Sequence, residues 1–197
     1  KLAYRDTRGT LKLPLPRMAG AHQADNAALA IAILRHQSAI DVPEAALAAA
    51  MEWAHWPARL QLLGPGPLTA ALPKGIEVWL DGGHNIDAGL VIAAHFGAAP
   101  PNSIRLVIGM LSNKDPSAII APIADKLASI TVVPVPGHAH HELADFVAAA
   151  GDISLSAVAD PKAAIAQIDL DQGQKILIAG SLYLAGVVLE LSGQQPD

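Results

Sequence analysis

The sequence feature that most constrains the fold is a series of five short runs rich in β-branched residues, each followed by a segment of helical character. The runs are IEVWLD, IRLVIGM, ITVVPV, ISLSAV and KILIAG, all between residues 76 and 180. Because they lack strict alternation of apolar and polar residues, they are typical of strands buried on both faces. Five such units in a row predict an α/β fold, in which a parallel-rich sheet is flanked by helices on both faces.

Local start and stop signals support the helices expected between these strands. Asp115-Pro116 and Asp160-Pro161 each combine an N-cap residue with a proline in the first turn. Pro122 is expected to kink or restart the helix predicted over residues 117–128. The other helices of this region are predicted over residues 86–96, 141–151, 161–168 and 181–191.

A different organisation is predicted before this series. Residues 1–16 are typical of a short hairpin, and two helices follow, over residues 21–38 and from 43 to about 53. Glycine and proline then cluster in LLGPGPLTAALPKG, as they do in linkers between compact units. We therefore expect two domains, residues 1–63 and residues 64–197.

Composition argues against several classes of protein. The net charge of −5 and the pI near 5.9 leave no basic face, so a nucleic-acid partner is not expected. The longest uncharged apolar run, residues 176–189, is shorter than the roughly 20 residues that span a bilayer, so no membrane partner is expected.

The absence of cysteine is compatible with a reducing compartment, and we expect a cytoplasmic protein. The opening KLAYRDTRG has neither an initiator Met nor a signal peptide, which indicates a piece of a longer protein.

Polar side chains are concentrated where the predicted strands end. The loops after four of the strands contain DGGHN, SNKD, GHAHH and GS, whereas the opposite loops AAPPNS and GDI are blander. In a parallel sheet the carboxyl ends of the strands share one edge, and ligands bind just outside it. The sequence therefore predicts a ligand site at this edge.

The turn DGGHN, residues 81–85, is one candidate within this site. Its glycines allow close backbone approach, and the following helix directs N–H groups and a partial positive charge at a phosphate or carboxylate. His84 and Asn85 would add donors, and Asp81 would accept from a ribose hydroxyl. The alternative is that Asp81 only caps the helix and His84 is a local hydrogen-bonding partner. The turn is not a GxGxxG fingerprint, so a dinucleotide site has weak support.

Other features of the same edge also have two interpretations each. Lys114 would neutralise an anion or remain solvated, and Ser181 would bind a substrate carboxylate or cap the last helix. The cluster HAHHE, residues 138–142, contains zinc-type ligands, but the spacing is not HExxH, so an exposed loop facing an anion is favoured over a metal site. The chain contains no phosphate loop of the form GxxxxGK[ST].

Five motifs then sharpen the interpretation: HQADNAA, WPARLQ, LDGGHN, VIGMLSNKD and LIAGSLYLAG, in this order. Together they resemble the C-terminal part of the folylpolyglutamate synthase / dihydrofolate synthase family of the Mur ligase superfamily, over essentially the entire chain. Gly83, Ile86 and Ala58 stand where the family often has alanine, proline and glycine. The resemblance implies that residues 1–63 are the mostly helical tail of a central ATPase domain. It implies that residues 64–197 are a Rossmann-like, glutamate-ligating C-terminal domain.

The resemblance also implies a reaction. In this family ATP phosphorylates a carboxylate of the pterin substrate, dihydropteroate or a folate, and the amine of L-glutamate attacks the acyl phosphate to give an amide. The residues implicated are Asn26, Arg59, Asp81 and His84 for ATP, His84 and Asn85 for catalysis, and Ser181, His84 and Lys114 for glutamate. The phosphate loop, the Mg²⁺ ligands and the pterin pocket would lie in an absent N-terminal ATPase part. The chain alone is therefore expected to be inactive.

Two rival functions remain open at this stage. Another Mur-type ligase would share the histidine-asparagine turn but join amino acids to a peptidoglycan precursor, although the GSLYLAG segment favours the folate branch. A non-catalytic nucleotide- or anion-binding domain would use the same edge without chemistry. A phosphate loop encoded upstream would exclude the second alternative.

Overall fold

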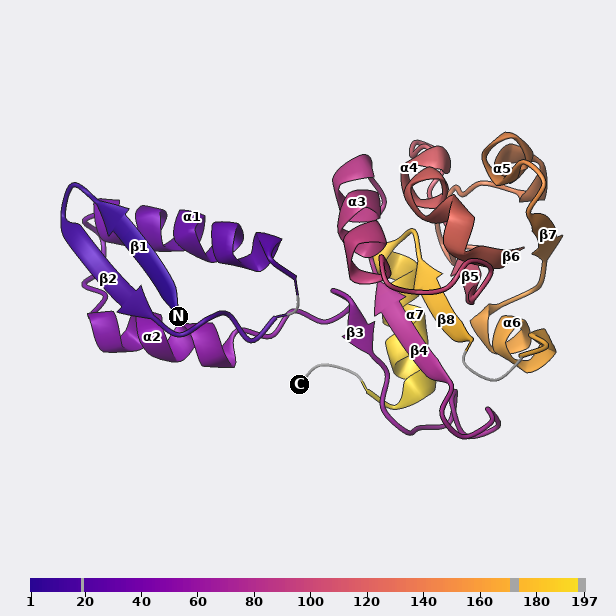
Figure 1. The fold of residues 1–197 in the computed structure, drawn as a ribbon, viewed down its shortest axis with the longest axis horizontal. Helices are drawn as coiled ribbons and strands as arrows, with labels where there is room; N and C mark the ends of the chain where they lie inside the picture. Colours follow the sequence, from indigo (N-terminus) through magenta and orange to yellow (C-terminus); the bar gives the residue numbers. More distant parts are fainter. Residues whose placement is uncertain (19, 171–173, 195–197) are drawn as a thin grey trace. The chain divides into compact units, whose positions relative to one another are not determined.

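The computed structural model describes residues 1–18, 20–170 and 174–194 in two compact units, Lys1–Pro57 and Ala58–Asp197 (Figure 1). The units divide earlier in the chain than the predicted boundary after Leu63. The reason is that β3 (Gln61–Leu62) pairs antiparallel with β4 (Glu77–Asp81) and so belongs to the sheet of the second unit. Among the described helices, none is both long and apolar enough to cross a membrane.

The first unit is a hairpin packed with two helices, as the sequence predicts. Strands β1 (Leu2–Asp6) and β2 (Gly9–Leu13) pair antiparallel, and helices α1 (His22–His36) and α2 (Glu44–Trp53) follow. Its small apolar core consists of Tyr4, Leu11, Leu13, Ile31, Leu47 and Met51.

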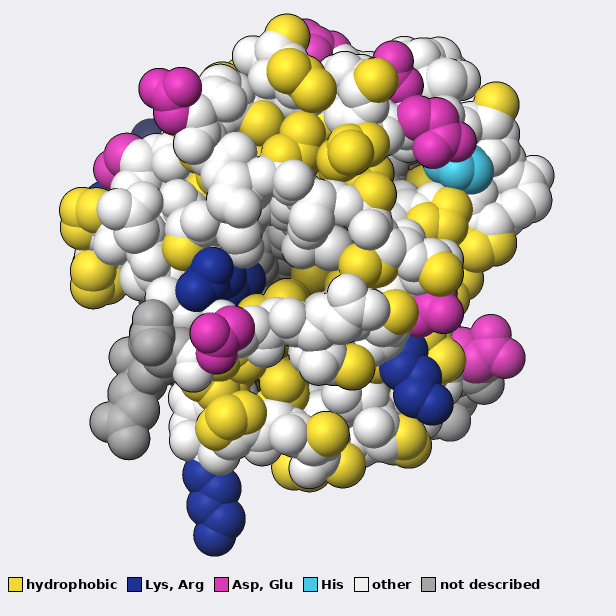
Figure 2. Space-filling model, turned by 90° about the vertical axis from the view of Figure 1, so that its right-hand side faces the viewer, with side chains coloured by type: hydrophobic (Ala, Val, Ile, Leu, Met, Phe, Trp, Pro, Cys, Tyr) yellow, Lys and Arg dark blue, Asp and Glu magenta, His cyan; other side chains and the backbone are white. Residues whose placement is uncertain are grey.

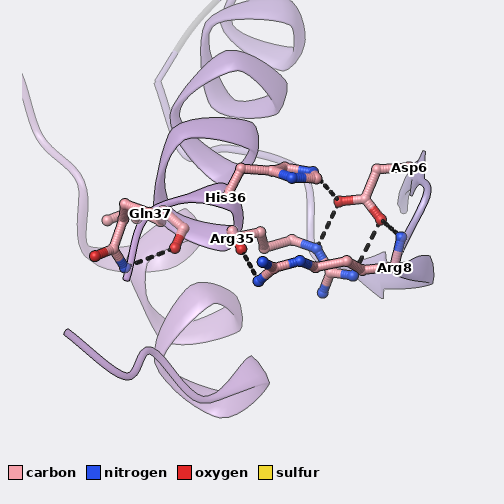
Figure 3. A network of polar contacts seen from close by, with 6 residues as sticks. Asp6, Arg8, Arg35, His36 and Gln37 are labelled. Atoms are coloured by element: carbon pink, nitrogen blue, oxygen red, sulfur yellow. Dashed lines mark hydrogen bonds and ion pairs between the residues drawn. The ribbon is translucent and has the colours of Figure 1, made fainter. Parts of the chain in front are cut away.

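A polar network joins the hairpin to the end of α1 (Figure 3). The Arg35 side chain donates from Nε to Asp6 Oδ2 at 2.8 Å and from its Nη2 to Oδ1 at 3.1 Å. The backbone N–H of Arg8 donates to Oδ1 at 2.8 Å, and His36 Nε2 lies 3.3 Å from Oδ2. The guanidinium of Arg8 also donates to the Arg35 carbonyl. The Asp6 carboxylate therefore fixes the hairpin turn against the helix.

This network makes the first unit sensitive to acid. Hydrogen bonds from Arg35 hold the pKa of Asp6 well below its ordinary value. The folded pKa then lies below that of the unfolded chain, roughly 3.9, so the stabilisation is complete above that pH and is lost as the pH falls toward the folded value. We expect the melting temperature of the first unit to fall below about pH 4, and to fall less steeply in Asp6→Asn.

Thermal unfolding followed by circular dichroism, between about pH 6 and pH 2, measures this difference. Asp41→Asn is the control, because Asp41 is exposed and has no side-chain partner in the described chain. Identical pH profiles for the natural chain and Asp6→Asn would contradict the assignment.

The second unit has the α/β fold that the sequence predicts. Its six-stranded sheet has the order β3-β4-β8-β5-β6-β7, and every pairing except that of β3 is parallel. The strands that complete the sheet are β5 (Ile104–Ile108), β6 (Leu127–Val132), β7 (Ser154–Ala157) and β8 (Lys175–Ala179). Strand β6 begins before the run ITVVPV and ends before Pro134, which has no N–H to extend the ladder.

Helices cover both faces of this sheet (Figure 1). Helices α3 (Ile86–His95), α4 (Ser117–Ile120) and α5 (Leu143–Ala150) pack in one apolar core, which includes Ile92, Ile119 and Phe146. Helices α6 (Pro161–Gln167) and α7 (Leu182–Ser192) pack in the other core. The interruption predicted at Pro122 is present, because α4 gives way to the 3-10 helix η1 (Ala121–Lys126).

Candidate functional site at the carboxyl edge of the sheet

The order of the strands determines where a ligand site is expected. Strand β8 is the last along the chain but lies between β4 and β5. The connections that leave β4 and β5 lead to helices of one core, and the connection that leaves β8 leads to α7 in the other. Ligands of doubly wound sheets bind at the carboxyl ends of strands where neighbouring connections diverge in this way. The turns after β4 and β8 occupy this position.

Glycines allow these two turns to pack against each other. The N–H of Gly180 donates to the carbonyl of Gly83 at 3.1 Å. A Cβ at Gly82 would lie 2.3 Å from Leu182 Cδ2, and a Cβ at Gly83 would lie 2.4 Å from the Cβ of Ala88. The glycines thus serve close contact within the protein, in addition to any approach of a ligand.

The N-terminus of α3 lies directly after this turn. Asn85 is its N-cap, and the side-chain oxygen accepts from the N–H of Ala88 at 3.0 Å. The alternative in which Asp81 caps this helix is therefore wrong. His84 is half-buried, with Nδ1 3.4 Å from the carbonyl of Gly82. The imidazole and the first N–H groups of α3 are thus at the same corner of the sheet.

Arg59 lies on a loop with an unusual backbone. Its two neighbours, Ala58 and Leu60, have φ values of 57° and 43°, in the left-handed region that favours glycine. The loop is held to the end of β4, because the N–H of Gly82 donates to the carbonyl of Ala58 at 2.8 Å. Arg59 is half-buried, and no side-chain partner is found for it in the described chain.

Asp81 joins the loop of Arg59 to the glycine turn. Its carboxylate accepts from the N–H of Leu60 at 2.8 Å through Oδ2 and from the N–H of Gly83 at 2.6 Å through Oδ1. The residue is only 5% exposed. One buried carboxylate therefore fixes the position of Arg59 relative to His84.

Ser181 occupies the N-cap of α7. Its hydroxyl accepts from the N–H of Tyr183 at 3.1 Å, and the residue is 3% exposed. The capping role considered for this serine is therefore present in the structure. Whether it also binds a substrate carboxylate stays a prediction.

The loops after β5 and β6 are joined beside these turns. His141 Nε2 lies 2.6 Å from the carbonyl of Lys114, and its Nδ1 lies 3.3 Å from Asp145 Oδ2. The N–H of Glu142 and the His141 side chain lower the pKa of the Asp145 carboxyl. His138 stacks on Tyr183, with 3.7 Å between ring centroids, which connects this loop to the first turn of α7.

The side chains of the histidine cluster, residues 138–142, take part in contacts within their own part of the chain. No group of three or more histidine, aspartate or glutamate side chains is arranged to hold a metal ion among the residues that the structure describes. His140 Nδ1 lies 2.7 Å from the carbonyl of His138, so this imidazole is used within its own loop.

The structure brings most of the predicted site residues together at the edge of the second unit: Arg59, Asp81, His84, Asn85, Lys114 and Ser181. Asn26 is in the first unit, exposed on α1, where its Nδ2 donates to Gln23 Oε1 at 3.2 Å. Sequence reasoning missed the roles of Leu60 and Tyr183. For Leu60 the sequence did contain a signal. The related family often has glycine at the position of Ala58, which indicates a left-handed backbone in this loop.

Comparisons with known proteins agree with this architecture. No family model matches the chain. It is 31% identical over 170 residues to a probable bifunctional folylpolyglutamate synthase/dihydropteroate synthase of Halobacterium salinarum, a match that covers 83% of this chain and 19% of the relative. It is 29% identical to the folylpolyglutamate synthase of Lacticaseibacillus casei, covering 95% of this chain and 42% of that protein.

Solved structures show the same fold. E. coli FolC in complex with ADP matches with a TM-score of 0.73 and 26% identity, over 96% of this chain and 43% of FolC. A folylpolyglutamate synthase of Mycobacterium tuberculosis, complexed with ADP and AMPPCP, matches with a TM-score of 0.72. The fold is that of a Mur-type ligase domain. Within that class the chain is similar to folylpolyglutamate synthases, and it spans less than half the length of the relatives it matches.

Proposed function

We propose that the longer protein to which this chain corresponds is an ATP-dependent ligase that joins L-glutamate to dihydropteroate, to folylpolyglutamate, or to both. The observation that carries the proposal is the edge holding Arg59, Asp81 and His84 in a domain with the FolC fold. A solved structure of E. coli FolC that matches this chain at 27% identity is in complex with DHPP and ADP. That ligand pair supports a folate-type acceptor and a nucleotide.

The proposed reaction has two steps. A carboxylate oxygen of the pterin substrate attacks the γ-phosphorus of ATP, the bond to the departing ADP oxygen breaks, and an acyl phosphate forms. The glutamate amine then attacks the acyl carbon, phosphate leaves, and the nitrogen loses a proton. Both steps develop negative charge on oxygen atoms, which donors held in fixed positions stabilise.

The described residues supply such donors. In this proposal Arg59 faces the phosphates of ATP, and His84 with the N–H groups of α3 faces the transferred phosphate. Asp81 lies near the ribose of ATP. Its two hydrogen bonds from backbone N–H groups fix the position of the Arg59 loop relative to the turn that carries His84. Asn26 would approach the base.

The glutamate site is proposed on the neighbouring turns. Lys114 is half-buried on the loop after β5, Ser181 follows the neighbouring strand β8, and His84 follows β4, the next strand beyond β8. A cation and hydroxyl- or imidazole-type donors suit the carboxylates of glutamate.

Two observations support the view that further chain is needed for activity. Large apolar side chains of the first unit are exposed, including Trp53 at 79%, Leu29 at 64% and Trp56 at 63%, as expected where further protein packs. In this proposal the Mg²⁺ ligands also lie in further chain, and no group of three or more acidic or histidine side chains among the described residues could hold a metal ion.

The test is phosphate release by the longer protein in the presence of ATP, dihydropteroate and L-glutamate. We expect activity in the natural protein, and a loss of about 100-fold or more in Arg59→Ala and His84→Ala, the magnitude typical of removing a donor to developing charge. Lys126→Ala, before β6 at the opposite edge of the sheet, is the control and should retain activity. The 197-residue chain alone should release none.

Two results would overturn the proposal. Absence of phosphate release with every pterin acceptor would reassign the protein to another Mur-type ligase or to a binding domain. Full activity of both variants would remove this edge from the reaction.

A further inference from the structure

The sheet face beneath α6 changes character along its strands. Toward the carboxyl ends, Val107 and Val133 are buried in the core that includes Ala164 of α6. Residues two positions earlier on the same face are Arg105 and Thr131, and Ser129 lies two before Thr131. Polar side chains thus replace the apolar residues that normally fill a strand buried on both faces.

Strand pairing gathers these polar residues. Arg105 is in register with Ser129 on β6, and Thr131 is in register with Ser156 on β7. The Thr131 and Ser156 hydroxyl oxygens are 3.4 Å apart. Three strands therefore place a guanidinium and three hydroxyls on one small area of this sheet face.

A pocket lies over this area. Helix α6 is only seven residues long and ends at Gln167. Between it and the sheet is a cavity of about 170 Å³, lined by the four polar residues together with Ile168 and Asp169. Figure 2 shows this face, hollowed near its centre beside a basic side chain. The volume suits a ligand of a few heavy atoms, because pockets for larger ligands measure roughly 300–1,000 Å³.

The Arg105 guanidinium in this pocket has more hydrogen-bond donors than its described contact uses. Arg105 Nε donates to Gln174 Oε1 at 3.1 Å. Within the described residues no carboxylate forms an ion pair with Arg105. Its Nη groups form the planar fork that binds carboxylates with two parallel hydrogen bonds, and the nearby hydroxyls add further donors. The carboxylate of Asp169 at the same pocket opposes a second negative charge on the ligand.

We propose that this pocket binds a small monocarboxylate, with the carboxylate on Arg105 and on the hydroxyls of Ser129, Thr131 and Ser156. The apolar side chain of Ile168 contacts the remainder of the ligand. The site lies within the strands, on the sheet face that α6 covers, whereas His84 lies on the turn that follows the carboxyl end of β4.

The test is a titration of the ¹⁵N-labelled 197-residue chain with sodium acetate at constant ionic strength, followed by NMR at the amides of Ser129, Thr131 and Ser156. We expect saturable shifts with a dissociation constant on the order of millimolar, as suits a ligand of few atoms. Arg105→Met should weaken binding by at least about tenfold, because it removes a charged hydrogen bond donor. Lys162→Met, on α6 but outside the pocket lining, should leave the affinity unchanged.

Sodium phosphate and sodium chloride are the comparison ligands. Absence of saturable shifts with acetate, or phosphate binding as tightly as acetate at these amides, would overturn the proposal. So would an unchanged affinity in Arg105→Met. If that variant does not fold, Ser156→Ala gives the decision, since Ser156 is exposed and loss of its hydroxyl should weaken acetate binding by about fivefold.

Discussion

Gly89→Ala is expected to lower the free energy of unfolding of the second unit by about 3 kcal/mol or more. Gly89 is buried within α3, and a Cβ built there lies 2.0 Å from the carbonyl oxygen of Ala118 and 3.1 Å from Pro122 Cγ. A backbone carbonyl cannot rotate away as a side chain would, so α3 and α4 must separate and disturb the core around Ile92. The greater helix propensity of alanine, about 1 kcal/mol, is too small to offset this.

Gly186→Ala is the matched control for this prediction. Gly186 is also inside a helix, α7, but nothing lies within 4 Å of its built Cβ. The same substitution should therefore raise the free energy of unfolding by about 0.5–1 kcal/mol. Urea unfolding followed by circular dichroism compares the two variants. If both substitutions changed the free energy of unfolding by the same amount in the same direction, the close packing of α3 and α4 at Gly89 would not be the cause.

Asp81→Asn is expected to lower the free energy of unfolding by about 2–4 kcal/mol. The carboxylate accepts from two buried backbone N–H groups, those of Leu60 and Gly83, through different oxygens. An asparagine has one side-chain oxygen, so one N–H loses its acceptor and faces an amide NH₂ instead. Leu60 then loses the contact that holds its left-handed backbone, and the loop of Arg59 loosens.

Amide hydrogen exchange measured by NMR tests this directly. The amides of Leu60 and Gly83 should exchange faster in Asp81→Asn than in the natural chain. Asp152→Asn is the control, because Asp152 is exposed and the change should stay within about 0.5 kcal/mol. Unchanged exchange at both amides would show that Asp81 does not hold the loop. In the longer protein, the same variant should lose phosphate release.

Much of the fold could be predicted because its signals are local. Strands such as Ile104–Ile108 are short runs rich in β-branched residues, and Asp160 caps α6 through the N–H of Ala163 at 2.7 Å, as its place before Pro161 predicts. Pairing order is not a local property. Nothing in the composition of β8 indicates that it lies between β4 and β5. The early unit boundary has the same origin, since two residues, Gln61 and Leu62, join the sheet through pairing alone.

The location of the site could also be predicted, because the topology of a parallel sheet gathers its loops at one edge. The backbone conformation and the surroundings of individual residues could not be predicted. Ala58 and Leu60 have left-handed backbones. Alanine and leucine rarely adopt this conformation, so their presence in the sequence does not predict it. Arg105 and Thr131 are embedded in strand-like runs, where a polar residue gives no sign of the pocket that α6 leaves above it.

The central position of β8 has a consequence for how the protein is made. A ribosome that has delivered the chain as far as α6 has produced both β4 and β5, yet the strand that pairs with each of them, Lys175–Ala179, is still to come. Until then each presents an unpaired edge, of the kind that associates with other chains. The hydrogen bond between Gly180 and Gly83, which joins the turns after β4 and β8 at the carboxyl edge, also cannot form before β8 is made. Synthesis therefore assembles the site last, and a product shortened before β8 is expected to aggregate rather than retain partial function.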